Sequence, residues 1–216
     1  MKVAVIGGGL GGAAAALALH RRGVEVGLYE KAPELSEIGA GLNLSPNALK
    51  AFRYLGIERG AISTGFQAKE QVIRSFRSGR TIARPRRSGD IEEKYGATFL
   101  TMHRADLLRL LVQELPDRLV HLNSACIGAE NRENVAVARF EDGVEIEADI
   151  VVGADGIHSA VRDSVFGQRE PRFTGCICWR GLVPGEALPN PSFGRQMMAW
   201  WGPHGHIVHY PVRRDG

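Results

Sequence analysis

Short apolar runs alternate with glycine-rich turns and helix-forming stretches at the start of the chain. Residues 2–6 form a β-branched run that predicts a buried strand of a parallel sheet. The alanine- and leucine-rich residues 13–22 predict a helix that ends at Gly23, because glycine adopts a left-handed cap with the least strain. Residues 24–29 predict a second strand. A strand, a helix and a strand in this order predict an α/β fold with a parallel sheet.

The apolar pattern of the remaining chain predicts further helices and strands. Ser45 suits the N-cap of a helix and Pro46 suits its first position, and apolar residues then recur at helical spacing as far as Leu55. The other predicted elements are a strand at 97–102, a helix from 103 to 115, strands at 119–122, 135–140 and 148–152, and an Asp-Gly hairpin turn at 141–144.

The glycine-rich residues 7–12 lie between the first strand and the helix, with the spacing G-x-G-x-x-G at Gly7, Gly9 and Gly12. Gly7 permits a tight turn, Gly9 lets the backbone approach a pyrophosphate, and Gly12 lets the helix pack closely on the strand. The helix N-terminus offers free N–H groups and a positive dipole end to phosphates. Glu30 follows the second strand, 23 residues after Gly7, where a carboxylate can accept both ribose hydroxyls. The unit predicts a dinucleotide site, and its acid disfavours a 2′-phosphate on the adenine ribose.

Two alternatives stay open for this unit. A glycine-rich turn before a helix can also bind nothing. If the unit binds a dinucleotide, NAD and FAD are equally suitable, because both contain an adenosine diphosphate half.

Three later segments contain further candidate residues. Gly39 and Gly41 leave the backbone bare, as contact with a flat ring requires, although a glycine bend before a helix is the alternative. Arg104 lies in the first turn of a predicted helix, where the dipole opposes a cation and a bound phosphate would relieve that opposition. A solvated surface arginine is the alternative there. Asp155 follows the predicted strand at 148–152 and is expected to face the same crevice as the glycine loop.

In their order along the chain, these motifs resemble the N-terminal part of the class A flavin-dependent aromatic hydroxylases, the family of salicylate and p-hydroxybenzoate hydroxylases. The resemblance implies a Rossmann-like FAD-binding domain with a parallel sheet, at residues 1–70 and 97–170. It also implies part of a mixed β-sheet substrate domain, at residues 71–96 and 171–216, in which 178–183 and 200–213 resemble strands. The features that carry it are residues 7–12 with Glu30, residues 39–41 before Pro46 and Asn47, residues 103–107, and residues 153–156 with Ser159 and Arg162.

The resemblance further implies an FAD-dependent monooxygenase that hydroxylates a small phenolic or carboxylated aromatic substrate. Such an enzyme uses O2 and takes its electrons from NADH or NADPH. The glycine loop would bind the FAD pyrophosphate, Glu30 the adenosine ribose and Arg104 the diphosphate, while Asp155 would belong to a motif linked to both FAD and the nicotinamide donor. The expected cofactor-binding residues are Gly7, Gly9, Leu10, Gly11, Gly12, Glu30, Lys31, Gly41, Arg104 and Asp155.

The sequence alone does not identify the catalytic residues. A phenolic substrate needs a base or a hydrogen-bond partner that raises the electron density of its ring. The candidates are His206, His209 and Tyr210. In a strand, His206 and Tyr210 would share one face and His209 would lie on the other. For each histidine, a surface or hydrogen-bonded structural role is the alternative.

The composition, 44% apolar and 24% charged over 216 residues, is that of a globular protein of one to two domains. Three cysteines without a disulfide pattern fit a reducing, cytoplasmic setting. Cys176 and Cys178 are expected to alternate on a strand rather than to ligate a metal, and no metal site is expected. No apolar run is long enough for a membrane span.

Six arginines and no acid lie between Arg74 and Arg87, in a chain of net charge +3. Only Phe76 is an aromatic residue among them, so a nucleic-acid surface is not expected. A solvated hairpin is the favoured interpretation, and guidance of the nicotinamide phosphates is the alternative.

Members of the resembled family are nearly twice as long and have a later Gly-Asp motif for the ribityl chain of the flavin. No Gly-Asp-Ala follows Asp155 here, so the chain is expected to be an N-terminal part of such an enzyme. The alternatives are a catalytically inactive FAD- or ADP-binding fragment and, less favoured, an NAD-dependent dehydrogenase. The strand edge around residues 207–210 is expected to be exposed, and a homodimer is one expected assembly.

Overall fold

The computed structural model describes residues 1–35, 40–188, 190 and 195–214. The chain forms two compact units, each assembled from two separate stretches of sequence. The first unit comprises Met1–Glu37 and Leu108–Cys178, and the second comprises Ile38–Leu107 and Trp179–Gly216. The division expected from the sequence groups residues 38–70 and 97–107 with the nucleotide-binding part, and as a domain assignment it stays a prediction.

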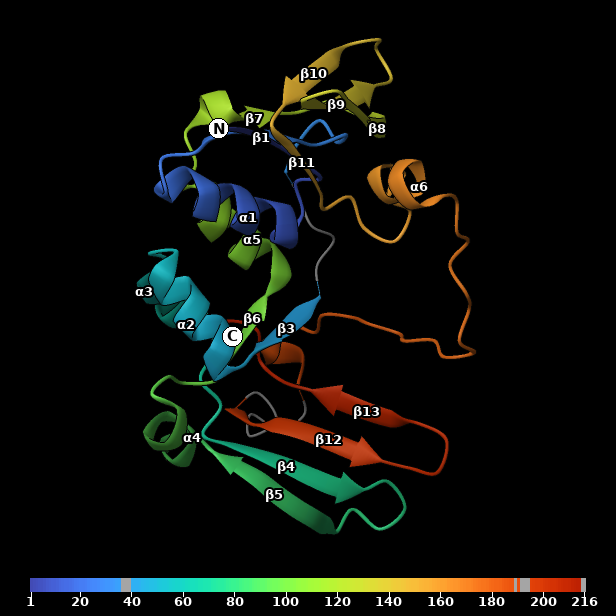
Figure 1. The fold of residues 1–216 in the computed structure, drawn as a ribbon. Coiled ribbons are helices and arrows are strands. Elements are labelled where there is room, and N and C mark those ends of the chain that lie inside the picture. The colour runs from blue at the N-terminus through green and yellow to red at the C-terminus, as the bar shows by residue number, and fades with distance from the viewer. Residues whose placement is uncertain (36–39, 189, 191–194, 215–216) are drawn as a thin grey trace. The chain divides into compact units, whose positions relative to one another are not determined.

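A parallel four-stranded sheet in the order β11-β1-β2-β7 forms the centre of the first unit (Figure 1). β1 (Lys2–Ile6) and β2 (Glu25–Tyr29) are joined by helix α1 (Leu10–Arg21), which confirms the predicted strand, helix and strand. β11 (Ile150–Gly153) pairs with β1, and β7 (Val120–His121) pairs with β2. The side chains of β1 from Val3 to Ile6 are at most 2% exposed, because α1 contacts this strand and the side chains of Ala4 and Ile6 pack in a core cluster with Ala138 and Phe140.

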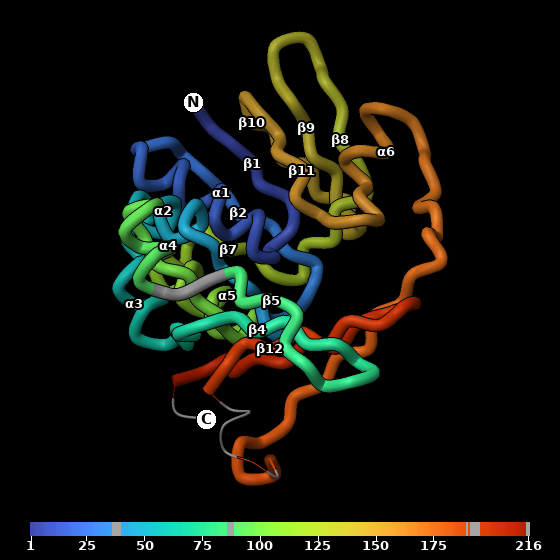
Figure 2. Tube along the Cα trace, turned by 90° about the horizontal axis from the view of Figure 1, so that it is seen from below, coloured from blue at the N-terminus to red at the C-terminus, as the bar shows by residue number. Residues whose placement is uncertain are grey.

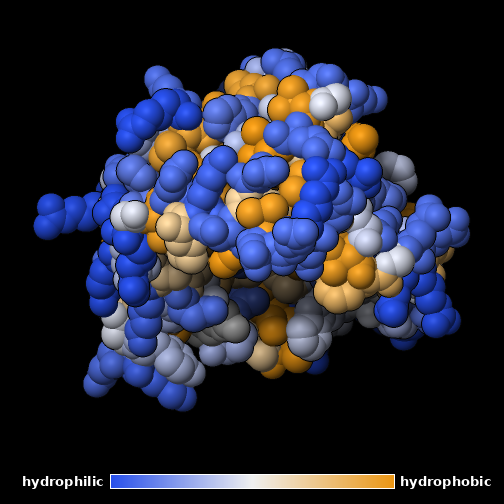
Figure 3. All heavy atoms as spheres, turned by 45° about the horizontal axis from the view of Figure 1, so that its top comes forward, coloured by the Kyte–Doolittle hydropathy of each residue, from blue (hydrophilic) through white to orange (hydrophobic). Residues whose placement is uncertain are grey.

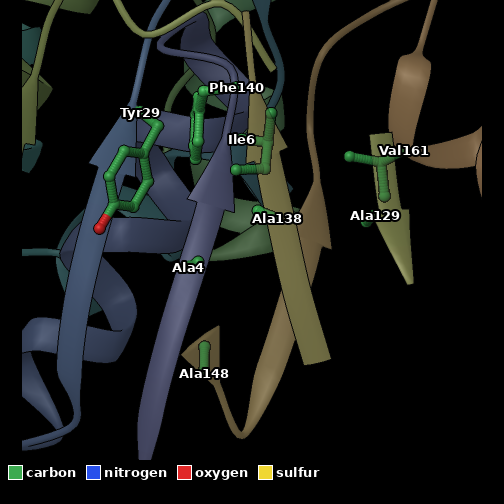
Figure 4. Packing of buried hydrophobic residues seen from close by; sticks show 8 residues of the cluster. All are labelled: Ala4, Ile6, Tyr29, Ala129, Ala138, Phe140, Ala148 and Val161. Atoms are coloured by element: carbon green, nitrogen blue, oxygen red, sulfur yellow. The ribbon is translucent and has the colours of Figure 1, made fainter. Parts of the chain in front are cut away.

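Three antiparallel strands complete the first unit, in the order β10-β9-β8. They are β8 (Cys126–Arg132), β9 (Val135–Phe140) and β10 (Glu145–Ala148). The predicted Asp-Gly turn joins β9 to β10, and Gly143 there has a φ of +84°. Helix α6 (Ala160–Phe166) and the short helix η1 (Asp117–Leu119) also belong to this unit. Figure 4 shows its core cluster, made of Ala4, Ile6, Tyr29, Ala129, Ala138, Phe140, Ala148 and Val161.

The second unit contains two sheets and several helices. β3 (Gly41–Leu44) and β6 (Leu100–His103) form an antiparallel pair. The mixed sheet has the order β13-β12-β4-β5, in which β12 is parallel to β4 and the other pairs are antiparallel. Its strands are β4 (Glu70–Ser75), β5 (Thr81–Arg87), β12 (Met197–Trp201) and β13 (His206–His209). The helices are α2 (Pro46–Tyr54), α3 (Glu58–Thr64), α4 (Ser88–Tyr95) and η2 (Gly185–Ala187), and α5 (Arg104–Val112) begins here. The expected α/β class with a parallel and a mixed sheet is confirmed.

The predicted continuous strand at 148–152 is wrong, because the chain changes sheets at Asp149. Ala148 ends β10 in the antiparallel sheet, and Ile150 begins β11 in the parallel sheet. The backbone N–H of Asp149 donates to the carbonyl of Lys2 (2.9 Å), and its carboxylate accepts from the backbone N–H of Lys2 (2.6 Å). These bonds hold the corner against the start of β1.

The predicted strand at 178–183 is also wrong. Residues 167–184 contain no helix or strand and follow an extended path, shown in orange in Figures 1 and 2. Cys176 and Cys178 are exposed and do not alternate on a strand. The segment carries strongly exposed apolar side chains, Trp179 among them at 91%. Apolar alternation alone does not make a strand, since a ladder needs a neighbouring strand to pair with.

The surface mixes apolar and polar residues. On the face drawn in Figure 3, hydrophobic residues lie in separate patches among hydrophilic ones. Among the described residues, no helix is both long and apolar enough to span a membrane. Within the same part of the chain, no group of three or more His, Cys, Asp or Glu residues is arranged to hold a metal ion.

Candidate functional site

The turn after β1 is closed by two backbone hydrogen bonds. Gly7 N–H donates to the carbonyl of Tyr29 (2.8 Å), and Ala154 N–H donates to the carbonyl of Ile6 (2.7 Å). Gly7 has a φ of +102°, and a Cβ there would lie 2.5 Å from the carbonyl oxygen of Ala154. Only glycine suits both the conformation and the space. The tight turn predicted at Gly7 is confirmed, and it packs against the loop that follows β11.

Gly12 is the point of closest approach between α1 and this turn. A Cβ at Gly12 would overlap the carbonyl oxygen of Gly7 and would lie 3.3 Å from Cβ of Ala154. α1 starts at Leu10 with Gly9 as its N-cap, has no acidic side chain in its first turn, and has no side-chain cap. Its first backbone N–H groups therefore have no side-chain cap and no neighbouring acid in the same turn, which suits the binding of a diphosphate.

Glu30 lies beside the glycine loop, as the spacing predicts. Its carboxylate accepts hydrogen bonds from the backbone N–H of Gly8 (2.5 Å) and of Ala32 (2.9 Å). A Cβ at Gly8 would lie 2.9 Å from Cβ of Glu30, so the loop and the acid touch. The side chain of Lys31 is exposed next to it. The structure thus brings Gly7, Gly9, Leu10, Gly11 and Gly12 together with Glu30.

Asp155 lies in the loop that packs on Gly7, and its Cα would be 2.9 Å from a Cβ at Gly7. Its carboxylate is already engaged, because it accepts from the Ser159 hydroxyl (2.5 Å) and from the backbone N–H of Val161 (3.2 Å). The Ser159 hydroxyl in turn accepts from the backbone N–H of Arg162 (3.0 Å) and caps α6. Sequence reasoning named Ser159 only as part of a motif and missed this link. A serine four residues after an acid and just before a helix was the available signal.

Replacing Ser159 by alanine is expected to lower the free energy of unfolding by about 1–2 kcal/mol, because the cap of α6 and the tether of Asp155 are both lost. Urea unfolding of the purified chain measures the change. Ser159→Thr keeps the hydroxyl and should remain close to the parent. Ser63→Ala removes an exposed hydroxyl in the other unit and should alter the value by less than about 0.5 kcal/mol. A Ser159→Ala chain as stable as the parent would refute the tether.

A second group of candidate residues lies in the second unit, around Gly41. Gly41 of β3 pairs with His103 of β6. The side chains of Tyr210 and Val212 lie against Gly41, and a Cβ there would overlap the Tyr210 ring and lie 2.7 Å from Val212 Cγ1. A glycine is needed at position 41 because these two side chains pack closely on it. From the sequence, the same glycine is explained by contact with a flat ring. Gly39, the other glycine of that motif, lies outside the described residues together with Glu37 and Ile38.

Arg104 is the first residue of α5, and its backbone N–H donates to the carbonyl of Ala40 (3.0 Å). Arg104 and Gly41 therefore belong to one local arrangement, which joins two motifs that are far apart in the sequence. Asp106, in the same first turn of α5, is 2% exposed. Its carboxylate receives a two-point hydrogen bond from the Arg213 guanidinium.

The catalytic candidates lie on or next to the edge strand β13. His206 pairs with Trp201 and is exposed, whereas His209 pairs with Met198. Burial lowers the pKa of His209 below its ordinary value of 6.5. β13 is the outer strand of its sheet as described, and Ile207 and Val208 are exposed at 59% and 39%, whereas His209 and Tyr210 are partly buried. The expected exposure of residues 207–210 therefore holds for the first two only. Tyr210 packs with the apolar cluster of Ala68, Phe99 and Met197.

The arginine-rich stretch forms the β4–β5 hairpin, as expected. Arg84 makes an ion pair with Glu70 (2.7 Å), and both side chains are partly exposed. The Arg74 guanidinium lies 5.5 Å from the ring centroid of Trp200, its neighbour across the sheet. The sequence reasoning missed this cation–π contact, because nothing local links residues 74 and 200.

Comparison with known proteins identifies the family of this chain. The family model described as an FAD binding domain matches residues 1–185. The chain belongs to the FAD binding domain family. The glycine loop fits this FAD-binding family on structural grounds, since the contacts at Gly7 and Gly12 exclude a Cβ and the start of α1 has no side-chain cap, which suits a diphosphate. FAD, rather than NAD, is the dinucleotide of the family.

The relatives of this FAD binding domain are monooxygenases. A 3-amino-4-hydroxybenzoate 2-monooxygenase from Streptomyces cremeus is 40% identical over 212 residues, which are 98% of this chain and 54% of that protein. A 6-hydroxynicotinate 3-monooxygenase from Pseudomonas fluorescens is 36% identical, over 98% of this chain and 55% of its own length. The chain spans about half the length of the curated relatives it matches.

A solved structure has the same fold as this FAD binding domain. Klebsiella pneumoniae HpxO, complexed with FAD and uric acid, has a TM-score of 0.83 and 26% identity, over 98% of this chain and 53% of its own. The resemblance to flavin-dependent aromatic hydroxylases that the motifs indicate is therefore confirmed. The role of each individual site residue stays a proposal.

Proposed function

We propose that this chain is the FAD-binding part of an FAD-dependent monooxygenase that hydroxylates a small phenolic or carboxylated aromatic compound. The observation that carries the proposal is the glycine turn, in which Gly7 and Gly12 pack against each other and against Ala154 with no space for a Cβ, beside the carboxylate of Glu30. The relatives, which are monooxygenases of hydroxybenzoates and of hydroxynicotinate, support the class of reaction.

FAD, when bound, supplies the activation of O2 and the transfer of oxygen to the ring. The chain's own residues bind and orient it. The free N–H groups at the start of α1 would receive the diphosphate, and Glu30 would accept the adenosine ribose hydroxyls. Asp155, tied to Ser159 and Val161, would hold the adjoining loop in place against Gly7. Lys31 and Arg104 would add positive charge for the phosphates.

Tyr210 and His206 are the proposed catalytic side chains. Tyr210 lies against Gly41, the residue expected to meet the flat ring of the cofactor. In a strand, His206 projects on the same side as Tyr210 and His209 on the opposite side. The His206 imidazole could take the proton of a phenolic substrate, and the Tyr210 hydroxyl could accept a hydrogen bond from it, and either would raise the electron density of the ring. His209, half-buried and with a lowered pKa, is better explained as a packing residue.

The proposal also includes the electron donor, the cellular location, the other reactants and the assembly of the enzyme. NADH or NADPH would supply the electrons, and the exposed arginines of the β4–β5 hairpin would attract its phosphates. We place the enzyme in the cytoplasm, in keeping with a chain that has few cysteines, and we expect O2 and a small aromatic acid as its other reactants. A homodimer that pairs through the exposed edge of β13 belongs to the same proposal.

Titration of the purified chain with FAD, ADP and NAD by calorimetry tests the proposal, together with a visible spectrum. We expect FAD to bind with a flavin absorbance, ADP to compete with it, and NAD to bind more weakly. Gly9→Val, whose added methyl groups would fill the pyrophosphate position, should abolish binding without unfolding the chain. Oxidation of NADH or NADPH that 3-hydroxybenzoate stimulates would support hydroxylation. A colourless chain with no heat of FAD binding would overturn the proposal.

A further inference from the structure

Residues 210–213 run alongside β6 after β13 has ended. The backbone N–H of His103 donates to the carbonyl of Val212 (3.0 Å). The hydroxyl of Thr101, which is fully buried, donates to the carbonyl of Pro211 (2.5 Å). Two consecutive carbonyls of this segment are therefore held by two residues of β6, and Tyr210 lies just before them.

The end of the segment is held by an ion pair with strongly asymmetric exposure. Arg213 Nε donates to Asp106 Oδ2 (2.8 Å), and Arg213 Nη2 donates to Asp106 Oδ1 (3.1 Å). The Asp106 side chain is 3% exposed, whereas that of Arg213 is 53% exposed. A planar guanidinium on both oxygens of a carboxylate fixes direction as well as distance. Because a buried carboxylate strongly needs a partner, this pair holds the segment more firmly than an exposed pair would.

The contact at Gly41 is the structural result of this anchoring. The Tyr210 ring and the Val212 side chain lie on Gly41 with no space for a Cβ between them. Gly41 in turn pairs with His103, the residue that binds the Val212 carbonyl. One continuous set of contacts thus runs from β3 through β6 to the start of α5. It consists of the Tyr210 side chain on Gly41, the bound carbonyls of Pro211 and Val212, and the ion pair of Arg213 with Asp106.

We propose that the Asp106–Arg213 ion pair is a clasp that fixes Tyr210 against Gly41. Asp106 and Arg213 are then positioning residues, since they act through Tyr210. The consequence for flavin binding rests on the proposed function, in which Gly41 and Tyr210 adjoin the flavin ring.

Nuclear magnetic resonance of the 216-residue chain with ring-13C tyrosine tests the clasp directly. The chain has four tyrosines, Tyr29, Tyr54, Tyr95 and Tyr210, and Tyr210→Phe identifies the signal of Tyr210. In Arg213→Gln we expect the Tyr210 signal to move and the other three to stay. Arg213→Lys, which keeps the charge but not the two-point geometry, should move it less. Asp106→Asn should move it as Arg213→Gln does, and the double variant should add little.

Arg53→Gln is the matched control. Arg53 makes the same two-point ion pair with Glu58 (2.8 and 2.7 Å) in the same unit, but its pair does not involve the 210–213 segment. This variant should leave the Tyr210 signal unchanged. If Asp106→Asn does not fold, Arg213→Gln decides the question, because its side chain is largely exposed. An unmoved Tyr210 signal in a folded Arg213→Gln chain overturns the clasp.

Calorimetric titration with FAD and ADP separates the clasp from the proposed function. We expect Arg213→Gln to weaken FAD about fivefold, a typical coupling between neighbouring sites, and to leave ADP unchanged. A Tyr210 signal that moves together with a weaker FAD affinity supports both ideas. A signal that moves while FAD affinity stays the same supports the clasp and overturns the placement of Gly41 and Tyr210 at the flavin.

Discussion

Replacing Gly12 by alanine is expected to abolish FAD binding and to lower the free energy of unfolding by about 3 kcal/mol. The new Cβ would overlap the carbonyl oxygen of Gly7 and crowd Cβ of Ala154, neither of which is a flexible side-chain end. Relief requires α1 to move away from the turn, and this movement would displace the backbone N–H groups at the start of α1 that are proposed to bind the diphosphate. We expect a loss of FAD affinity of more than about 100-fold, measured by calorimetry at a temperature where the variant is folded.

Gly11→Ala is the control for this prediction. Gly11 is the preceding residue of the same helix, it is exposed, and nothing lies within 4 Å of the position of its Cβ. Alanine there should raise the free energy of unfolding by up to about 1 kcal/mol, since glycine is a poor helix former. Equal urea midpoints for Gly11→Ala and Gly12→Ala would show that the close packing at Gly12 does not matter.

Replacing Glu30 by alanine is expected to weaken FAD and ADP by about 1.5–3 kcal/mol, which is the range for hydrogen bonds to a charged group. FMN, which lacks the adenosine ribose, should be unaffected. The carboxylate also accepts from the N–H groups of Gly8 and Ala32, so the variant should be less stable as well. Calorimetry with the three ligands and urea unfolding measure the two effects separately.

Glu30→Gln helps to distinguish the two roles of this acid. The amide oxygen can still accept one backbone N–H, so most of the stability should return. The affinity for FAD and ADP should recover less, because the amide carries no charge for the two ribose hydroxyls. A comparable loss for FMN and ADP in Glu30→Ala would mean that Glu30 acts only through the conformation of the loop.

The first strand, the glycine turn, α1 and the position of Glu30 could be predicted because they depend on local chemistry. Gly7 needs a positive φ, and the acid follows its strand at a fixed distance along the sequence. The hairpin turn at Gly143 was predictable for the same reason. Each of these features is decided by residues that lie close together in the sequence.

Other features escaped prediction because they depend on partners that are distant in the sequence. The strand at 148–152 breaks because Asp149 binds Lys2, which is 147 residues away in the sequence. Residues 178–183 have the composition of a strand, but within the described part of the chain no strand pairs with them. The packing of Tyr210 on Gly41 and the pair of Arg213 with Asp106 bring together segments that nothing in the local sequence connects.

The pairing of β1 with β11 sets the order in which the chain can mature during synthesis. One edge of β1 can pair with β2 early in synthesis, but the other edge receives β11 only when residues 150–153 have been made. The hydrogen bond from Ala154 N–H to the carbonyl of Ile6 can form only after that. At ordinary translation rates, this leaves the apolar edge of β1 uncovered for on the order of ten seconds. The nascent chain therefore passes through a period in which one edge of β1 has no partner, and the glycine turn cannot receive its hydrogen bond from Ala154 before that period ends.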